Sequence, residues 1–158
     1  MIPINEAIET GAWLRADFRP DNSLEHDVSN GGNVSFRFRV SGFSKIDLSM
    51  VAQYEDLSVG LDSNIWKLDV DVVNLNKKEM VIDVVRDRLF LADDEGFEFK
   101  VFEDAHLSLH SKFDSRLMAF YILRLPPKIK RAGAYTYELP DDFEHGFLII
   151  RNGELREA

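Results

Sequence analysis

The chain has 158 residues, of which 45% are hydrophobic, and it carries a formal net charge of −9. This length suits one domain, and the apolar content is enough for a sizeable core, so composition excludes an intrinsically disordered chain. The negative charge opposes binding to phosphate backbones and anionic membranes, so we expect no nucleic acid partner. Without cysteine, disulfides, cysteine nucleophiles and thiolate metal sites are excluded.

The first ten residues have neither a basic segment nor a long apolar run, so they do not match a signal peptide. No apolar run in the chain approaches the roughly 20 residues of a membrane span. We therefore expect a cytoplasmic protein if Met1 is the native start. If a leader has been removed, we expect a periplasmic or secreted protein.

Residues 1–33 are predicted to form an N-terminal arm, or a short helix and a loop, packed on a domain of residues 34–158. Apolar residues at helical spacing within 3–18 favour the helix, and an irregular arm is the alternative. Residues 20–33 are polar and contain Asn30-Gly31-Gly32-Asn33, which predicts a loop.

The best-specified local structure is a hairpin around Asp93-Asp94-Glu95-Gly96. Leu89 and Leu91 alternate with other residues before this segment, and Phe97, Phe99 and Val101 alternate after it. Acidic residues are costly to bury, and Gly96 supplies the positive φ that a tight reversal needs. Two alternating runs joined by an Asp/Gly turn predict an antiparallel β-hairpin.

Other segments that alternate or run apolar are predicted as strands. They are residues 34–40 with a continuation towards 59, 65–75, 80–85, 105–110, 117–125, 134–139 and 147–150. A short buried helix is the alternative for 117–125. The run 80–85 is out of phase with Leu89 and Leu91, which predicts burial on both faces or a β-bulge near Arg86. Residues 128–133 are predicted as a basic turn, and Asn152-Gly153 as the end of the last strand.

Eight or nine short strands without alternating helices are typical of an all-β antiparallel sandwich or barrel. Aromatic residues at period two are predicted to fill its core. They are Phe36, Phe38, Phe97, Phe99, Tyr135 and Tyr137.

Four motifs in residues 64–150 follow one another in a fixed order. They are Val70 to Asn74 with a polar turn, Leu91 to Phe99 with Asp93 and Gly96, Leu125-Pro126-Pro127 with Gly133, and Tyr137 to Pro140. In this order the chain resembles bacterial immunoglobulin-like domains of unknown function, which are common in secreted proteins and lipoproteins. The resemblance implies an immunoglobulin-like β-sandwich that serves as an interaction or structural module and has no catalytic residues to carry over.

Histidines 106 and 110 are the first candidate metal ligands. On a helix they would share one face and could bind one zinc ion, but the alternating Leu107 and Leu109 favour a strand. On a strand they lie roughly 13 Å apart, too far for one metal. We therefore assign no metal site there, and a helix over 105–110 would reverse that assignment.

Carboxylates and one basic cluster are the remaining candidates. Asp69 and Asp71 share a strand face about 7 Å apart, as a catalytic pair would, or they form a solvated face that pairs with Arg37 and Arg39. Asp93, Asp94 and Glu95 offer calcium ligands but lack the spacing of a calcium loop, so they are interpreted as turn residues. The cluster Pro126 to Arg131 is interpreted as a proline turn with solvated lysines, or as a contact for an acidic partner.

We therefore assign no catalytic, cofactor-binding or metal-binding residue and no cofactor. The chain is predicted to be a non-enzymatic module acting through protein–protein contacts, with an exposed sheet edge as one route. One alternative is a small acidic inhibitor, either an immunity protein or a nucleic-acid mimic. The other is a metal-binding protein or an enzyme.

Overall fold

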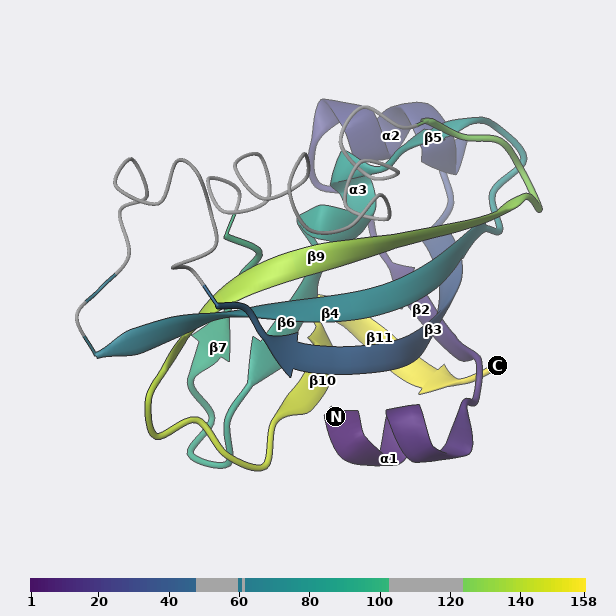
Figure 1. The fold of residues 1–158 in the computed structure, drawn as a ribbon. Helices are drawn as coiled ribbons and strands as arrows, with labels where there is room; N and C mark the ends of the chain where they lie inside the picture. Colours follow the sequence, from purple (N-terminus) through teal and green to yellow (C-terminus); the bar gives the residue numbers. More distant parts are fainter. Residues whose placement is uncertain (48–59, 61, 103–123) are drawn as a thin grey trace.

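The computed structural model describes residues 1–47, 60, 62–102 and 124–158. A five-stranded and a four-stranded antiparallel sheet enclose one hydrophobic core, and a short two-stranded ribbon lies at the side (Figure 1). The predicted all-β antiparallel sandwich is confirmed. The described residues form eleven strands, and those at Ile2–Pro3, Leu14–Phe18 and Gly153–Glu157 were not predicted.

The five-stranded sheet has the order β11-β2-β3-β4-β9, and the four-stranded sheet has the order β1-β10-β6-β7. In the first sheet the strands are β11 (Gly153–Glu157), β2 (Leu14–Phe18), β3 (Val34–Lys45), β4 (Ser63–Asn74) and β9 (Lys130–Pro140). In the second they are β1 (Ile2–Pro3), β10 (Phe147–Ile150), β6 (Leu89–Ala92) and β7 (Glu98–Phe99). The ribbon pairs β5 (Met80–Val81) with β8 (Arg124–Leu125).

The long strands β3 and β4 follow the predicted alternation. Phe36, Phe38 and Val40 of β3 are buried, and they lie opposite Asn74, Val72 and Val70 of β4. The register shifts between Val40 and Gly42. One face of this sheet therefore builds the core, and the opposite face carries the alternating polar residues.

Strand β9 runs alongside β4, and Tyr135, Tyr137 and Leu139 are buried on one face as predicted. The hydroxyl of Tyr137 donates a hydrogen bond to the carbonyl oxygen of Leu89, at 2.9 Å, and so ties the two sheets together. Burial raises the pKa of this phenol, so it is a neutral donor at every ordinary pH.

The predicted hairpin is present, with β6 and β7 as its arms and Gly96 at a φ of 91°. Asp93 closes the turn, because its Oδ1 accepts hydrogen bonds from the backbone N–H groups of Glu95 and Phe97. The prediction that Phe97 is a core residue is wrong, since its exposed fraction is 63%. Residue 97 belongs to the turn rather than to the arm that begins at Glu98.

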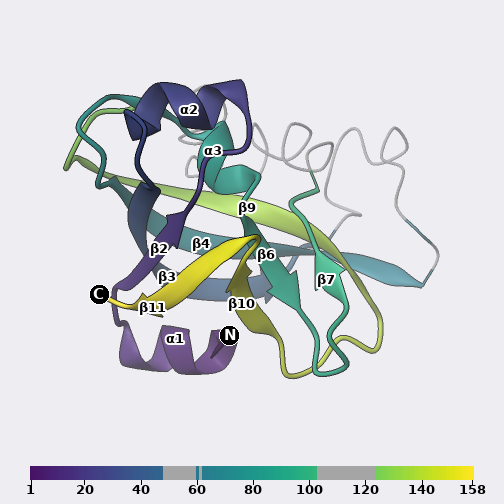
Figure 2. The ribbon, with the colours of Figure 1, turned by 180° about the vertical axis from the view of Figure 1, so that it is seen from behind.

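Residues 1–33 hold more regular structure than expected. The predicted short helix is present as α1 (Ile4–Thr10), which lies beside the sheets near the C-terminus (Figure 2). The predicted loop is wrong for α2 (Ser23–Ser29), whose first turn is capped by the Asn22 side chain. Strand β2 was not predicted, yet it lies between β11 and β3 in the large sheet.

Three further expectations are corrected. The strand predicted over 80–85 ends at Val81, and no bulge forms near Arg86. Instead α3 (Asp83–Arg86) forms a single helical turn that buries Val84 and Val85. The predicted basic turn at 128–133 overlaps β9, which begins at Lys130. The tail after Asn152 is the edge strand β11.

Some expectations fall outside the described residues. They are residues 48–59 of the continuation predicted after the strand at 34–40, the segment 105–110 with His106 and His110, and most of 117–125. Only Arg124 and Leu125 of the last segment belong to a described strand.

Asn74 joins two of the motifs noted in the sequence. Its buried amide donates hydrogen bonds to the carbonyl oxygens of Lys78 and Leu125, each at 2.8 Å. Its Oδ1 accepts from the backbone and the side chain of Asn76, and its backbone bridges to Pro127. The end of β4 and the Leu-Pro-Pro segment are therefore held together by one side chain.

Candidate binding surface

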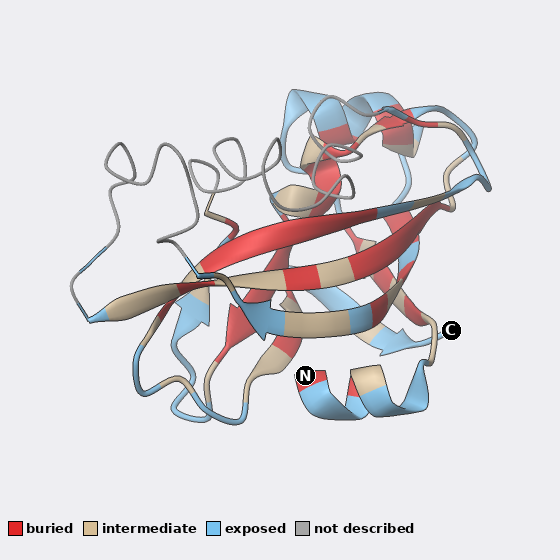
Figure 3. Cartoon of the chain, viewed as in Figure 1, coloured by how far each residue is buried: buried red, intermediate tan, exposed pale blue. Residues whose placement is uncertain are grey.

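The outer face of the large sheet, the side turned away from the core, carries the candidate binding residues. In Figure 3 the front strand β3 shows exposed and intermediate residues, while β9 is buried along most of its length. The polar side of β3, together with β2 and β11, therefore presents side chains to solvent. We call the outer-face residues Trp13, Arg15, Arg37, Arg39 and Arg156 the arginine–tryptophan face.

These arginines lie in neighbouring positions on adjacent strands. Arg156 of β11 is opposite Arg15 of β2, and Arg15 is opposite Arg37 of β3. The same row continues through Val73 to Lys130 of β9, so four of its five positions are cationic. Directly opposite residues have Cβ atoms about 4.5–5.5 Å apart, and like charges at this spacing destabilise a sheet. The row thus concentrates positive charge at a cost to folding, in a chain whose net charge is −9.

Trp13 holds two of the guanidinium groups. The Cζ atoms of Arg37 and Arg39 each lie 4.8 Å from the centroid of its ring system. Guanidinium groups at this distance are attracted to the electron-rich ring face, and the indole restricts their motion. The tryptophan therefore fixes both arginines over the sheet.

The carboxylates near this face are already engaged. Asp17 binds Arg15 at 3.1 Å and Arg156 at 3.0 Å, and it also accepts a hydrogen bond from Ser35. Asp71 binds Arg39 at 2.9 Å. Glu154 lies 4.0 Å from Arg156, at the limit of an ion pair. Arg37, by contrast, is exposed and has no carboxylate within ion-pair distance in the described part of the chain.

The two aspartates of β4, Asp69 and Asp71, form ion pairs with different partners. The expected cross-strand pair between Arg39 and Asp71 is present, and Asp71 is nearly buried. Asp69 does not reach Arg37; its Oδ1 lies 3.6 Å from the Nζ of Lys67. Neither aspartate of β4 therefore forms an ion pair with Arg37.

A second cluster is buried rather than exposed. Arg88 donates to Glu25 through Nε, at 2.8 Å, and through an η nitrogen, at 2.6 Å. It also binds the Arg151 carbonyl at 2.8 Å and the Asp21 carboxylate at 2.9 Å, and stacks on Phe18 at 4.4 Å. A depression of about 290 Å³ lies beside it. The guanidinium donors of Arg88 have partners, so the cluster stabilises the contact between α2 and the start of β6.

The cluster shifts the pKa values of its two carboxyl groups in opposite directions. Burial favours the neutral form of Glu25, but hydrogen bonds from Arg88 and from the Asp21 N–H outweigh it and hold the pKa of Glu25 below 4.5. The hydrogen bond shared with Glu25 raises the pKa of Asp21, and burial adds to that increase. Glu25 is therefore the proton-resistant member of the pair.

Acid should weaken the fold through Glu25. Because its folded pKa lies below the unfolded value, its stabilisation is complete above pH 4.5 and is lost as the pH falls through the folded pKa. Asp21, with a raised pKa, acts in the opposite sense and offsets part of this loss. We expect urea midpoints to fall as the pH is lowered from 5 towards 3, and the Glu25→Gln variant to show a smaller fall. Equal pH dependence in both proteins would contradict this role of Glu25.

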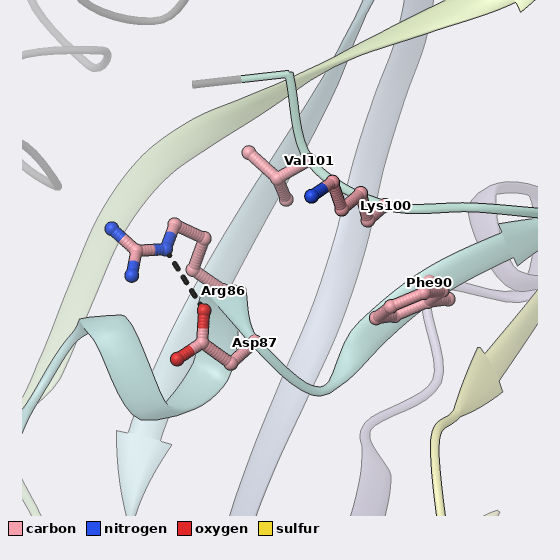
Figure 4. Close-up of a pocket in the computed structure, with 5 residues that line it drawn as sticks. All are labelled: Arg86, Asp87, Phe90, Lys100 and Val101. Carbon is pink, nitrogen blue, oxygen red and sulfur yellow. Dashed lines mark hydrogen bonds and ion pairs between the residues drawn. The ribbon is translucent and has the colours of Figure 1, made fainter. Parts of the chain in front are cut away.

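A small pocket lies between the end of α3, strand β6 and residues 100–101 (Figure 4). Arg86 and Asp87 form an ion pair at 3.1 Å on one side, and Phe90, Lys100 and Val101 line the rest. Its volume of about 100 Å³ is well below the roughly 300–1,000 Å³ of small-molecule sites. The pocket is too small for a cofactor-sized ligand.

The other sequence candidates are dispersed. Asp93 is used in the hairpin turn, while Asp94 and Glu95 are exposed. His106 and His110 lie outside the described residues, within which no group of three potential metal ligands occurs. Of the basic cluster, Lys130 lies at the end of the arginine row. Sequence reasoning missed Trp13 and Arg15, although β2 alternates in the same way as β3.

None of the helices in the described residues has the length and apolar character required to cross a bilayer. No protein-family model matches the chain, and no curated protein matches it either.

Solved structures with similar folds have low sequence identity. A secreted protein of Mycobacterium tuberculosis, MPT63, is 12% identical, with 70% of each chain covered and a TM-score of 0.47. A conserved hypothetical protein of Bacillus anthracis is 11% identical, with 92% of this chain and 96% of that chain covered and a TM-score of 0.49. A putative lipoprotein of Bacillus subtilis is 10% identical, with 75% of this chain and 36% of that chain covered and a TM-score of 0.43.

Proposed function

We propose that this chain is a non-enzymatic binding module that contacts another protein through the arginine–tryptophan face. The observation that carries the proposal is Arg37, an exposed guanidinium group held against Trp13 with no carboxylate partner among the described residues. Arginine and tryptophan are among the residue types most enriched where protein–protein binding energy concentrates. The immunoglobulin-like form of the sandwich belongs to this proposal, and the two antiparallel sheets around one core support it.

The rigidity of the face supports the same function. Arg15 lies in β2 and Trp13 directly precedes that strand, while Arg37 and Arg39 lie within the twelve-residue strand β3. Side chains on strands of a packed sheet are already ordered, so less conformational entropy is lost when a partner binds. The face is thus suited to recognition without a large rearrangement.

Position-specific crosslinking tests this proposal. A photo-reactive amino acid at position 154, on the exposed outer side of β11, should capture a partner in cells of the native host. The same amino acid at position 97, on the exposed hairpin turn, is the matched control. We expect a discrete product from position 154 that disappears when Arg37→Glu is added, and the partner should bind again as a purified protein.

Other crosslinking patterns would contradict the proposal. A product from position 97 alone would move the binding surface to the acidic hairpin. If that product contained a basic toxin or nuclease, it would support the acidic-inhibitor alternative.

A further inference from the structure

We infer that the arginine–tryptophan face recognises an acidic protein segment, in which side-chain carboxylates bind the arginines and an apolar side chain packs on Trp13. This inference rests on the proposed function and specifies the partner of the same surface. The charge balance of the face and the chemistry of its donors support it, and the charge of the whole chain favours a short peptide over a nucleic acid.

The face carries more cationic groups than carboxylates. The four arginines of the face and the neighbouring Lys130 lie beside three carboxylates, those of Asp17, Asp71 and Glu154. A fourth carboxylate on the same side of the sheet, that of Asp69, pairs with Lys67. The side chains of Asp17 and Asp71 are mostly buried, with exposed fractions of 13% and 12%, and both already bind arginines. The face therefore keeps a local excess of positive charge that its own residues do not neutralise.

The donors favour a carboxylate ligand. A guanidinium group presents paired N–H donors whose geometry matches the two oxygens of a carboxylate. Arg37 offers this fork to solvent, and its contact with Trp13 orients the fork before a ligand arrives. The neighbouring Arg15 and Arg156 share the single carboxylate of Asp17. Each of them retains N–H donors for a second carboxylate.

Phosphate-rich ligands also carry negative charge, but the whole chain disfavours them. A polyanion such as a nucleic acid extends over many residues and meets the remaining surface of a chain with a net charge of −9. A short peptide segment meets mainly the face itself, because charges farther away than about 8–10 Å are screened at physiological salt. The observations therefore favour a protein segment over a nucleic acid.

A defined peptide tests the inference with Trp13 as the reporter. The chain has two tryptophans, so the Trp66→Phe variant leaves Trp13 as the only indole. The probe is a ten-residue peptide, blocked at both ends, with four glutamates alternating with serine and one leucine. We expect it to change the fluorescence of Trp13 in a saturable manner, and we expect binding to weaken as salt is raised.

Matched comparisons make the result specific. The same peptide with glutamine in place of glutamate should bind at least tenfold more weakly, because hydrogen bonds to charged groups contribute about 1.5–3 kcal/mol. Arg37→Gln should weaken the glutamate peptide about tenfold, by the same reasoning. Arg124→Gln, at an exposed arginine of β8 paired with Glu79 at 3.4 Å, should leave binding unchanged.

Three results would overturn the inference. The first is equal binding of the glutamine and glutamate peptides, or binding that is insensitive to Arg37→Gln. The second is tighter binding of a ten-nucleotide single strand than of the acidic peptide. The third is self-association of the chain, measured by sedimentation, that Arg37→Gln abolishes. Crosslinks from position 154 to a partner without an acidic segment would refute the inference and leave the proposed function standing.

Discussion

Replacing Arg88 with methionine is expected to lower the free energy of unfolding by about 3–5 kcal/mol, among the largest effects of any single substitution in this chain. The side chain of Glu25 is fully buried, and its carboxylate receives two hydrogen bonds from Arg88. Without the arginine, a buried carboxylate would lose its counter-charge and most of its hydrogen bonds. Urea denaturation at pH 7 measures the change.

Two controls separate this effect from ordinary charge removal. Arg124→Met removes an exposed ion pair with Glu79 and should change stability by no more than about 1 kcal/mol. The double variant Arg88→Met with Glu25→Met should regain much of the lost stability, because replacing a whole buried pair by apolar residues is often neutral. If Arg88→Met lowers the free energy of unfolding no more than Arg124→Met does, the Arg88–Glu25 cluster does not stabilise the fold as proposed.

Replacing Asn74 with alanine should cost about 2–4 kcal/mol, since the substitution leaves several buried polar groups without partners. The side-chain N–H groups of Asn74 donate hydrogen bonds to the carbonyl oxygens of Lys78 and Leu125. Its Oδ1 accepts hydrogen bonds from the backbone N–H and the side-chain amide of Asn76. The loss would release β8 and the following proline segment from the end of β4.

The matched control for this prediction is Asn64→Ala. The side chain of Asn64 also donates one hydrogen bond, to Asp141 at 2.6 Å, but that bond is exposed to solvent. We expect a change within about 0.5 kcal/mol there, as for most surface substitutions. Equal losses for Asn74→Ala and Asn64→Ala would show that the buried amide network does not hold the segments together. Thermal unfolding followed by circular dichroism compares the two.

The strands that alternate cleanly were predictable from the sequence. Residues 34–40 and 66–72 place apolar and polar side chains on opposite faces, and a sheet with one buried face selects that pattern. The hairpin was predictable for a second reason, because Asp93 and Gly96 satisfy the turn locally. The expected pairing of Arg39 with Asp71 also followed from the shared face.

Features that depend on distant residues were not predictable. Arg88 and Glu25 are 63 positions apart, so no local pattern announces their contact. Strand β11 has a single apolar residue, Leu155, and its regular structure comes from pairing with β2. Helix α3 takes up the end of the segment 80–85, which is apolar except for Asp83 and whose pattern does not distinguish a strand from a buried helical turn.

The arginine–tryptophan face was only partly visible in the sequence for the same reason. The sequence showed that Arg37 and Arg39 share one face of a strand. It did not show that β2 and β11 would place Arg15 and Arg156 in the same row, because that row depends on the pairing register of three strands. Trp13 was assigned to an arm or helix, so its contact with the arginines was missed.

The binding surface is tested most directly by mapping amide chemical shifts while the glutamate peptide is added to the labelled protein. We predict that the largest changes fall on the arginine–tryptophan face, at Trp13, Arg37 and Arg156, and that they vanish with Arg37→Gln. Changes centred on the hairpin turn at residues 93–97, or on the pocket beside Phe90, would contradict the account.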